Sequence, residues 1–184
     1  MNQRIAINGF GRIGRTVLRA WTARESLRQT VSIAAINEIA DPETVAHLTQ
    51  YDSTHGRFPG TIARTDDALI VNGQSIALLR HTHIDKLPWR DLGIDLVIES
   101  TGAFSDRVTA EQHINSGARR VLFSQPAQSD VDATIVWGLN QSELQGNHQI
   151  ISAGSCTTNA LCPVLKIIDD VFGIEAGTIT TVHS

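Results

Sequence analysis

Cysteine is scarce in this chain: among its 184 residues, only Cys156 and Cys162 are cysteines. Two cysteines cannot build the disulfide framework of a small secreted domain, and their spacing is not that of a CxxC redox pair. Long apolar runs are also missing, because no stretch approaches the roughly 18 apolar residues of a membrane helix. The amino-terminal residues are too polar for a signal peptide. We therefore expect a cytoplasmic protein with no membrane partner.

An excess of positive charge is lacking as well. The chain has 15 Lys and Arg residues against 19 Asp and Glu residues, which gives a formal net charge of −4 at pH 7. Such a chain has no general attraction for nucleic acid, so we expect no nucleic-acid partner. Hydrophobic residues make up 41% of the sequence, a composition typical of a folded globular protein. The length suits one domain, or one domain with part of a second.

Short apolar runs alternate with segments of helical periodicity along the chain. This order is typical of an α/β protein with a Rossmann-type, doubly wound and mostly parallel sheet. Asn72-Gly73 separates two short apolar runs, which predicts a type I′ hairpin inserted at the sheet edge. Strands are expected over 4–7, 30–36, 68–71, 74–78, 95–100, 120–123, 132–137, 149–152 and 177–183, and helices over 13–28, 41–50, 106–116 and 156–171.

A glycine-rich segment, residues 9–14, lies between the first predicted strand and the first predicted helix. Its sequence fits G-x-G-x-x-G, which in this context indicates a dinucleotide site. Gly9 allows the tight turn, Gly11 lets a pyrophosphate approach the backbone, and Gly14 lets the helix pack closely. The free N–H groups of the helix start favour phosphate. The alternative is a generic turn between a strand and a helix.

Glu38 follows the second predicted strand. A carboxylate at this place accepts hydrogen bonds from a ribose diol and repels a 2′-phosphate, so it predicts NAD rather than NADP. The alternative is a solvated loop carboxylate.

Cys156 stands where a predicted strand gives way to a predicted helix. A helix N-terminus favours the thiolate, which is the nucleophilic form of cysteine. A strand–helix–strand unit could bring His183 back beside it as a base. The alternative is a small buried hydrophobe, which is our interpretation of Cys162. His81 and His83 alternate along the chain without a third ligand nearby, so no metal site is predicted.

Five blocks carry a family resemblance: NGFGRIGR (8–15), YDSTHGRF (51–58), ESTGAF (99–104), SCTTN (155–159) and TTVHS (180–184). In this order they resemble the phosphorylating glyceraldehyde-3-phosphate dehydrogenase superfamily. Within it the chain is most similar to the erythrose-4-phosphate dehydrogenases: Glu38 stands where typical glyceraldehyde enzymes have aspartate, and residues 121–124, 132–134, 169–170 and 172–175 favour the same group. The resemblance implies an NAD-binding Rossmann domain over residues 1–151. It also implies that residues 152–184 open an α+β catalytic domain, with its first helix and strand, of a longer, homotetrameric protein.

The resemblance also implies roles for individual residues. Cys156 would attack an aldehyde, His183 would act as general base, and Ser155 and Thr157 would border the substrate. The glycine loop would hold the cofactor with Phe10, Arg12 and Ile13, the last two at the pyrophosphate. Thr101 and Gly102 would lie near the adenosine, and Ser124 near the nicotinamide.

The implied reaction is the NAD-dependent oxidation of a small phosphorylated aldehyde through a thiohemiacetal and a thioester on Cys156. Erythrose 4-phosphate would yield 4-phosphoerythronate, an early step towards pyridoxal phosphate. The alternatives are the phosphorylating glyceraldehyde-3-phosphate reaction and a non-catalytic NAD-binding fragment.

Overall fold

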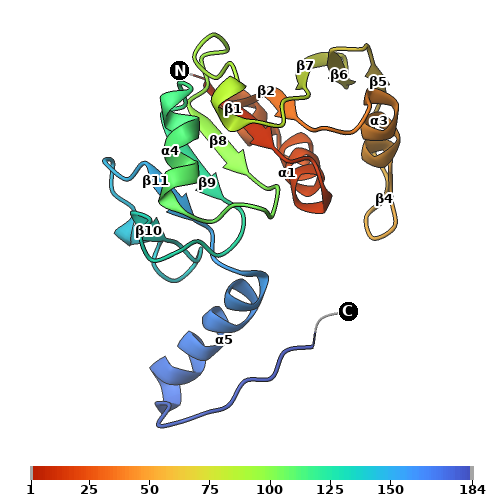
Figure 1. The fold of residues 1–184 in the computed structure, drawn as a ribbon. Helices are drawn as coiled ribbons and strands as arrows, with labels where there is room; N and C mark the ends of the chain where they lie inside the picture. The colour runs from red at the N-terminus through yellow and green to blue at the C-terminus, as the bar shows by residue number, and fades with distance from the viewer. Residues whose placement is uncertain (1, 183–184) are drawn as a thin grey trace.

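The computed structural model describes residues 2–182, and its centre is a nine-stranded sheet (Figure 1). The strand order is β10-β11-β9-β8-β1-β2-β7-β6-β5, and all neighbours from β10 to β7 are parallel. The first strand of the chain, β1, therefore lies in the middle. The parallel strands are β1 (Gln3–Asn8), β2 (Val31–Asn37), β7 (Gln74–Leu79), β8 (Leu96–Glu99), β9 (Arg120–Phe123), β10 (Ala133–Thr134) and β11 (Ile150–Ser152).

Helices or short 3-10 turns lie between most successive parallel strands, as the alternating pattern predicts, although β10 follows β9 without one. Asp41 and Asp106 are the N-caps of α3 and α4, and each accepts a hydrogen bond from the backbone N–H three residues later. The helices are α1 (Arg12–Ala23), α2 (Glu25–Thr30), α3 (Pro42–Gln50), α4 (Arg107–Asn115) and α5 (Cys156–Phe172), with short 3-10 turns η1 (Ile84–Lys86) and η2 (Gln141–Glu143). In the described residues, no helix is long and apolar enough to cross a lipid bilayer.

The core forms on both faces of the sheet because successive residues of a strand point to opposite sides. Ile7 of β1 packs in a cluster with Leu18 and Trp21 of α1. Its neighbour Ala6 belongs to a second cluster that contains Trp89. A third cluster joins residues of α4 to β9 and β11. The doubly wound α/β fold predicted from the sequence is thus confirmed.

The predicted hairpin is also confirmed, at the predicted edge. Strands β6 (Ala68–Val71) and β7 pair antiparallel around Asn72 and Gly73, whose φ angles are 51° and 82°. Two positive φ angles are what a type I′ turn requires. The sequence analysis missed the edge strand β5 (Ile62–Arg64) and the small hairpin of β3 (Tyr51–Asp52) and β4 (Gly56–Arg57).

Two predicted elements differ from those in the structure: one helix is broken and one strand is shorter. The helix predicted over 13–28 is broken at Arg24, whose extended backbone separates α1 from α2. The break turns the chain towards β2, where the Trp21 indole N–H donates to the carbonyl oxygen of Val31 at 2.9 Å. The strand predicted over 132–137 is only β10, because the Asn140 side chain binds the backbone of both Thr134 and Val136 and turns the chain.

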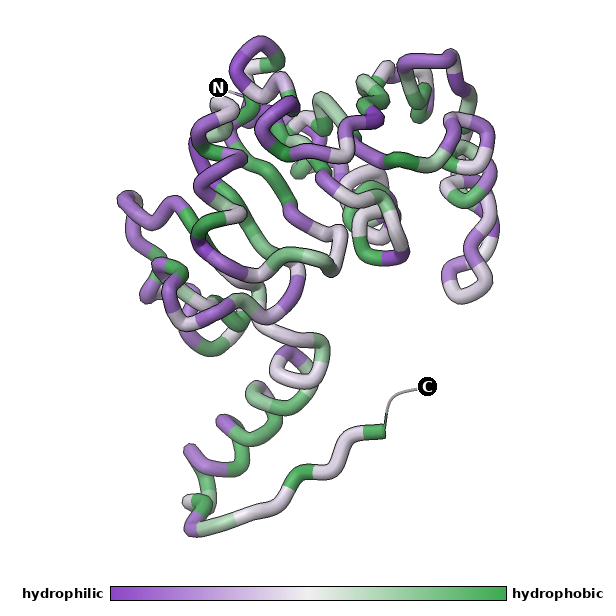
Figure 2. Tube along the Cα trace, viewed as in Figure 1, coloured by the Kyte–Doolittle hydropathy of each residue, from purple (hydrophilic) through white to green (hydrophobic). Residues whose placement is uncertain are grey.

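The carboxyl-terminal part differs most from expectation. The helix predicted over 156–171 is present as α5, but none of its residues is buried. Figure 2 shows that much of α5 is hydrophobic, and its exposed apolar residues include Val164, Ile167, Ile168, Val171 and Phe172. The strand predicted over 177–183 is wrong for residues 177–182, which have no strand neighbour to pair with in the described structure. Residue 183 lies outside the described residues.

Asp132 ties the start of α4 to β11. Its carboxylate accepts hydrogen bonds from the Gln149 N–H at 2.7 Å, the Ile150 N–H at 2.9 Å and the Arg107 guanidinium at 2.6 Å. Burial raises the pKa of Asp132, but the Ile150, Arg107 and Gln149 hydrogen bonds outweigh it and lower the pKa to about 2. A carboxyl whose pKa is lowered by folding stabilises the fold above its unfolded pKa, and this contribution disappears as the pH falls through the folded pKa.

We therefore expect Asp132→Asn to lower the free energy of unfolding at pH 7 by about 1 kcal/mol, because solvent screening at this exposed residue reduces the effect of the pKa shift. The difference from wild type should shrink as the pH falls from about 4 to about 2. Urea unfolding at pH 7 and at acidic pH measures both values. The same change at the exposed residue Asp66 is the control. If the difference in free energy of unfolding between Asp132→Asn and wild type stayed constant over this pH range, the lowered pKa of Asp132 would be contradicted.

Candidate functional site

Several predicted site residues, among them Gly9, Glu38 and Ser124, lie along one edge of the sheet. Glu38, Gly9, Ser100, Ser124 and Ala153 directly follow β2, β1, β8, β9 and β11, which are neighbouring strands. Because these strands are parallel, their carboxyl ends all open on the same edge. The chain winds outwards from β1 in both directions, to β2 on one side and to β8 on the other. A crevice at such a switch point is where doubly wound sheets bind ligands.

The glycine loop has the geometry that its spacing predicts. Gly9 has a φ of +86°, and a Cβ built on it would lie 2.5 Å from the backbone nitrogen of Thr101. A Cβ on Gly14 would lie 2.4 Å from the Gly9 carbonyl oxygen, so the start of α1 packs directly against the loop. Gly11 has open space on its Cβ side and is the N-cap residue of α1. The loop therefore leaves room for a ligand beside a helix N-terminus, where anions are favoured.

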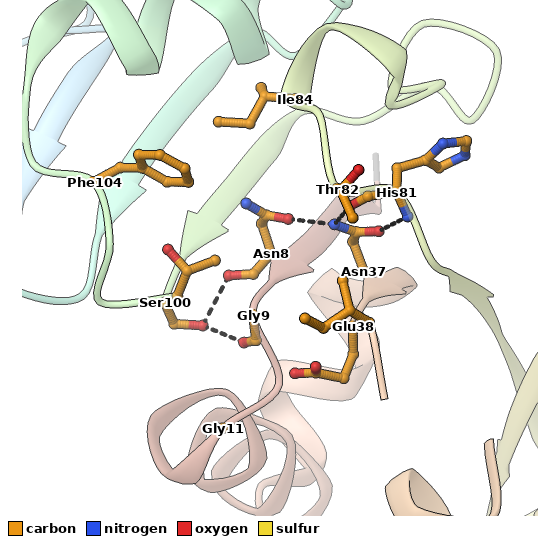
Figure 3. Close-up of a pocket in the computed structure, with 12 residues that line it drawn as sticks. Asn8, Gly9, Gly11, Asn37, Glu38, His81, Thr82, Ile84, Ser100 and Phe104 are labelled. Carbon is orange, nitrogen blue, oxygen red and sulfur yellow. Dashed lines mark hydrogen bonds between the residues drawn. The ribbon is translucent and has the colours of Figure 1, made fainter. Parts of the chain in front are cut away.

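A cavity of about 350 Å³ opens at the glycine loop (Figure 3). Thr101 and Phe104 line it from the loop that follows β8, and Ile84 from η1. The other lining residues come from the glycine loop and from the ends of β1, β2, β7 and β8: Asn8, Gly9, Gly11, Asn37, Glu38, Ile39, His81, Thr82 and Ser100.

Hydrogen bonds between neighbouring strand ends hold the cavity walls. The Asn37 amide donates to the Asn8 side-chain oxygen at 2.7 Å and to the His81 carbonyl at 3.0 Å. Its own oxygen accepts the His81 N–H at 2.9 Å. The Ser100 hydroxyl donates to the Gly9 carbonyl at 2.6 Å. The ends of β1, β2 and β8 and the segment after β7 are thus tied together before any ligand binds.

Glu38 lies at the cavity and also contacts the glycine loop. Its carboxylate accepts the Phe10 N–H at 2.8 Å and the Ala40 N–H at 3.2 Å. A carboxylate has about four acceptor positions, so two remain for a ligand. Glu38 can therefore fix the loop and accept ribose hydroxyls at the same time.

Cys156 is the first residue of α5. Ser155 is the N-cap, and its hydroxyl oxygen accepts the Thr158 N–H at 2.8 Å. The Asn159 amide donates to the carbonyl oxygens of Ala153 and Ser155, each at 2.8 Å, and so fixes the turn before the helix. Cys156 is exposed, whereas Cys162 is half-buried. The turn therefore presents the Cys156 thiol to solvent at the start of a helix.

The structure brings together only some of the predicted site residues. Gly9, Gly11, Glu38 and Thr101 line the cavity, while Arg12 and Ile13 are exposed at the start of α1. The side chain of Phe10 is buried in the core, and only its N–H faces Glu38. Gly102 is exposed on the loop after β8, and the other predicted residues lie outside the cavity lining: Ser124, Ser155, Cys156 and Thr157.

His183 lies outside the described residues. Sequence reasoning missed Asn8 and Ser100, although each is a polar residue at the end of an apolar strand. That pattern could have indicated them.

The geometry of the cavity fits a dinucleotide. It combines two glycines that no other residue could replace without a backbone collision, a third that opens into free space, a helix N-terminus and a carboxylate with spare acceptors.

Residues 3–107 match the family model described as "Glyceraldehyde 3-phosphate dehydrogenase, NAD binding domain". Residues 155–184 match the one described as "Glyceraldehyde 3-phosphate dehydrogenase, C-terminal domain". The chain belongs to the glyceraldehyde 3-phosphate dehydrogenase family of NAD-dependent phosphorylated-aldehyde dehydrogenases.

Proposed function

We propose that this protein oxidises erythrose 4-phosphate to 4-phosphoerythronate with NAD. The observation that carries the chemistry is the exposed Cys156 at the start of α5, on the same sheet edge as the nucleotide cavity. The choice of aldehyde rests on sequence, chiefly on Glu38 in place of the aspartate of typical glyceraldehyde enzymes. The proposed domain boundary lies between residues 151 and 152, one residue before the end of β11.

The protein's own groups would act as follows. The Cys156 thiolate attacks the aldehyde carbon, and the new C–S bond gives a thiohemiacetal. His183, assigned from the sequence resemblance alone, takes the thiol proton, returns it to the oxygen as the thiohemiacetal forms, and takes it back as the hydride leaves. The bound cofactor supplies the acceptor for the hydride that leaves the same carbon, so a thioester remains on Cys156. Water then releases the acid and restores the thiol. Ser155 and Thr157 border the substrate, and the Cys156 N–H is a candidate oxyanion donor.

The nucleotide would lie in the cavity between the glycine loop and Thr101. Arg12 and Ile13 begin α1 and would contribute backbone N–H groups to the pyrophosphate. Glu38 would accept the ribose hydroxyls, Thr101 and Gly102 would lie near the adenosine, and Ser124, which follows the next strand along the edge, would face the nicotinamide.

A rapid-mixing assay of NADH formation tests this function. The chain is mixed with NAD and either erythrose 4-phosphate or glyceraldehyde 3-phosphate, with and without inorganic phosphate. We expect a faster burst with erythrose 4-phosphate, and turnover that does not require phosphate. A faster burst with glyceraldehyde 3-phosphate, or turnover that needs phosphate, would instead favour the phosphorylating reaction.

A second candidate function is NAD binding alone. It is favoured by the position of α5, a helix of which no residue is buried. In that case the same assay would show no burst with either aldehyde, although calorimetry would detect NAD binding.

Glu38 provides a test of cofactor choice. Replacing it by alanine removes the ribose acceptor, the partner of the Phe10 N–H and the charge that repels a 2′-phosphate. We expect NAD affinity to fall by roughly tenfold and the preference for NAD over NADP to narrow. Calorimetric titration with both nucleotides measures this. Glu43→Ala on the exposed side of α3 is the control. An unchanged preference would remove Glu38 from the ribose site.

A further inference from the structure

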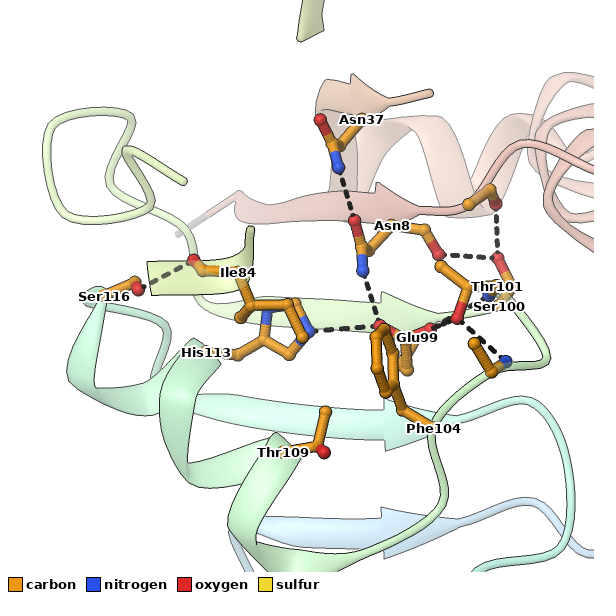
Figure 4. A network of polar contacts seen from close by, with 12 residues as sticks. Asn8, Asn37, Ile84, Glu99, Ser100, Thr101, Phe104, Thr109, His113 and Ser116 are labelled. Carbon is orange, nitrogen blue, oxygen red and sulfur yellow. Dashed lines mark hydrogen bonds and ion pairs between the residues drawn. The ribbon is translucent and has the colours of Figure 1, made fainter. Parts of the chain in front are cut away.

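Glu99, the last residue of β8, is a fully buried carboxylate that contacts two residues of the cavity lining, Asn8 and Thr101 (Figure 4). Its Oε2 accepts the Asn8 amide at 2.6 Å and the His113 Nε2–H at 3.1 Å. Its Oε1 accepts the Thr101 N–H at 2.9 Å and the Thr101 hydroxyl. Four donors occupy the roughly four acceptor positions of a carboxylate. Glu99 therefore has no acceptor left for a ligand, so its effect on the site must pass through these partners.

One set of hydrogen bonds in this network connects Glu99 to His113 of α4 and determines which ring nitrogen of His113 carries the hydrogen. The Trp89 indole N–H, which can only donate, points at His113 Nδ1 at 2.9 Å. Nδ1 must then be an acceptor, so the ring hydrogen is on Nε2, where it faces Glu99. Both Trp89 and His113 are fully buried. The histidine is thus neutral and the network carries the single negative charge of Glu99.

A second set of hydrogen bonds runs from Glu99 through Asn8 and Asn37, and the donor and acceptor in each of these bonds are also fixed. Because Glu99 only accepts, Asn8 must turn its NH₂ group towards it and its oxygen towards Asn37. Asn37 therefore donates to Asn8, and its own oxygen accepts the His81 N–H. The charge on Glu99 sets the orientation of the Asn8 amide, and the backbone N–H and carbonyl of His81 hold the Asn37 amide in the matching orientation. A continuous chain of hydrogen bonds therefore joins Glu99, through Asn8 and Asn37, to His81.

The ionised state of Glu99 agrees with this geometry. Burial raises the pKa of Glu99, but the hydrogen bonds from His113, Thr101 and Asn8 outweigh it and hold the pKa below its ordinary value. A buried carboxylate that accepts four hydrogen bonds has all its partners, whereas a buried carboxylate that lacked some of them would destabilise the fold. The Thr101 hydroxyl donates to Glu99 and accepts the Ala103 N–H at 3.2 Å. The loop after β8 is therefore held by the same charge.

We propose that Glu99 is a positioning residue of the nucleotide site, which with His113 and Asn8 holds Thr101, Asn37 and His81 in their binding arrangement. The inference rests on the proposed placement of NAD in the cavity and is independent of the chemistry proposed for Cys156. Four separate strand ends depend on one carboxylate, so losing its charge disturbs all walls of the cavity together.

Glu99→Gln is the direct test, because it keeps the shape and removes one acceptor. The new NH₂ group must face either the Thr101 N–H or the Asn8 and His113 donors, so each choice places a donor against at least one donor. We expect the dissociation constant for NAD, measured by calorimetry without aldehyde, to rise at least tenfold. We also expect the amide resonances of Thr101 and His81 to shift. Glu111→Gln, on the exposed side of α4, should leave both unchanged.

A pair of variants at His113 tests the same proposal if Glu99→Gln fails to fold. His113→Gln keeps one donor and one acceptor, and should bind NAD within about threefold of wild type, whereas His113→Phe keeps neither and should bind at least tenfold more weakly. Equal affinities in this pair, or Glu99→Gln binding within twofold with unshifted His81 and Thr101 amides, would overturn the proposal. Gly11→Val blocks the cavity opening. If this variant bound NAD normally, the placement of NAD would be wrong, and the inference would fall with it.

Discussion

Replacing Cys156 by serine is expected to abolish the burst of NADH that the wild-type chain forms from NAD and erythrose 4-phosphate. A serine hydroxyl stays protonated at neutral pH and is a far weaker nucleophile than a thiolate, so no thiohemiacetal accumulates. Loss of a nucleophile that acts together with a base lowers the rate by roughly a thousandfold or more. NAD binding should be unchanged, because Cys156 lies outside the cavity lining.

Cys162→Ser is the matched control within the same helix. Cys162 is half-buried on α5, and its replacement should preserve the burst. Alkylation gives a second measurement: iodoacetamide should modify Cys156 faster than Cys162 at pH 7. A burst that survives in Cys156→Ser, or that depends instead on Cys162, would remove Cys156 from the role of nucleophile.

Replacing Gly9 by alanine is expected to affect both stability and NAD binding strongly. A side chain at φ +86° costs about 1–2 kcal/mol in backbone energy alone. The added Cβ would also lie 2.5 Å from the Thr101 nitrogen and 2.6 Å from its Cα, which are backbone atoms and cannot rotate away. We expect the free energy of unfolding to fall by about 2 kcal/mol or more and NAD affinity to fall by at least tenfold.

Urea unfolding and calorimetric NAD titration measure the two effects of Gly9→Ala. Gly177→Ala is the control, because that glycine has an ordinary φ and open space at its Cβ position. If Gly9→Ala bound NAD as tightly as wild type, the contact between the glycine loop and Thr101 would not shape the site.

The fold was largely predictable because its signals are local. The apolar runs before Gly9 and Glu38 are short and uninterrupted, as strands covered on both faces must be. Asn72-Gly73 needs no distant partner to form its turn. The ends of helices and strands were predicted wrongly where they depend on tertiary contacts. The helix break at Arg24 follows from the contact of Trp21 with β2, which no local sequence pattern encodes.

The site was predictable only in part, for a similar reason. The glycine loop and Glu38 carry patterns that follow from the needs of a phosphate and a ribose. The network of Glu99 does not, because Trp89, His113 and Asn8 come from separate segments and meet only in the folded chain. One signal was available: Glu99 is a charged residue at the end of an otherwise apolar strand, a position that requires buried partners.

The strand order has a consequence for how the chain folds. β1 is made first but lies in the middle of the sheet, and its partner β8 ends at Glu99, 91 positions after Asn8. At ordinary rates of synthesis, roughly 5–20 seconds pass between the two strands. During that interval one edge of β1 has no partner, and an unpaired apolar edge can join another chain. The window for misassembly therefore opens during synthesis and closes once β8 is in place.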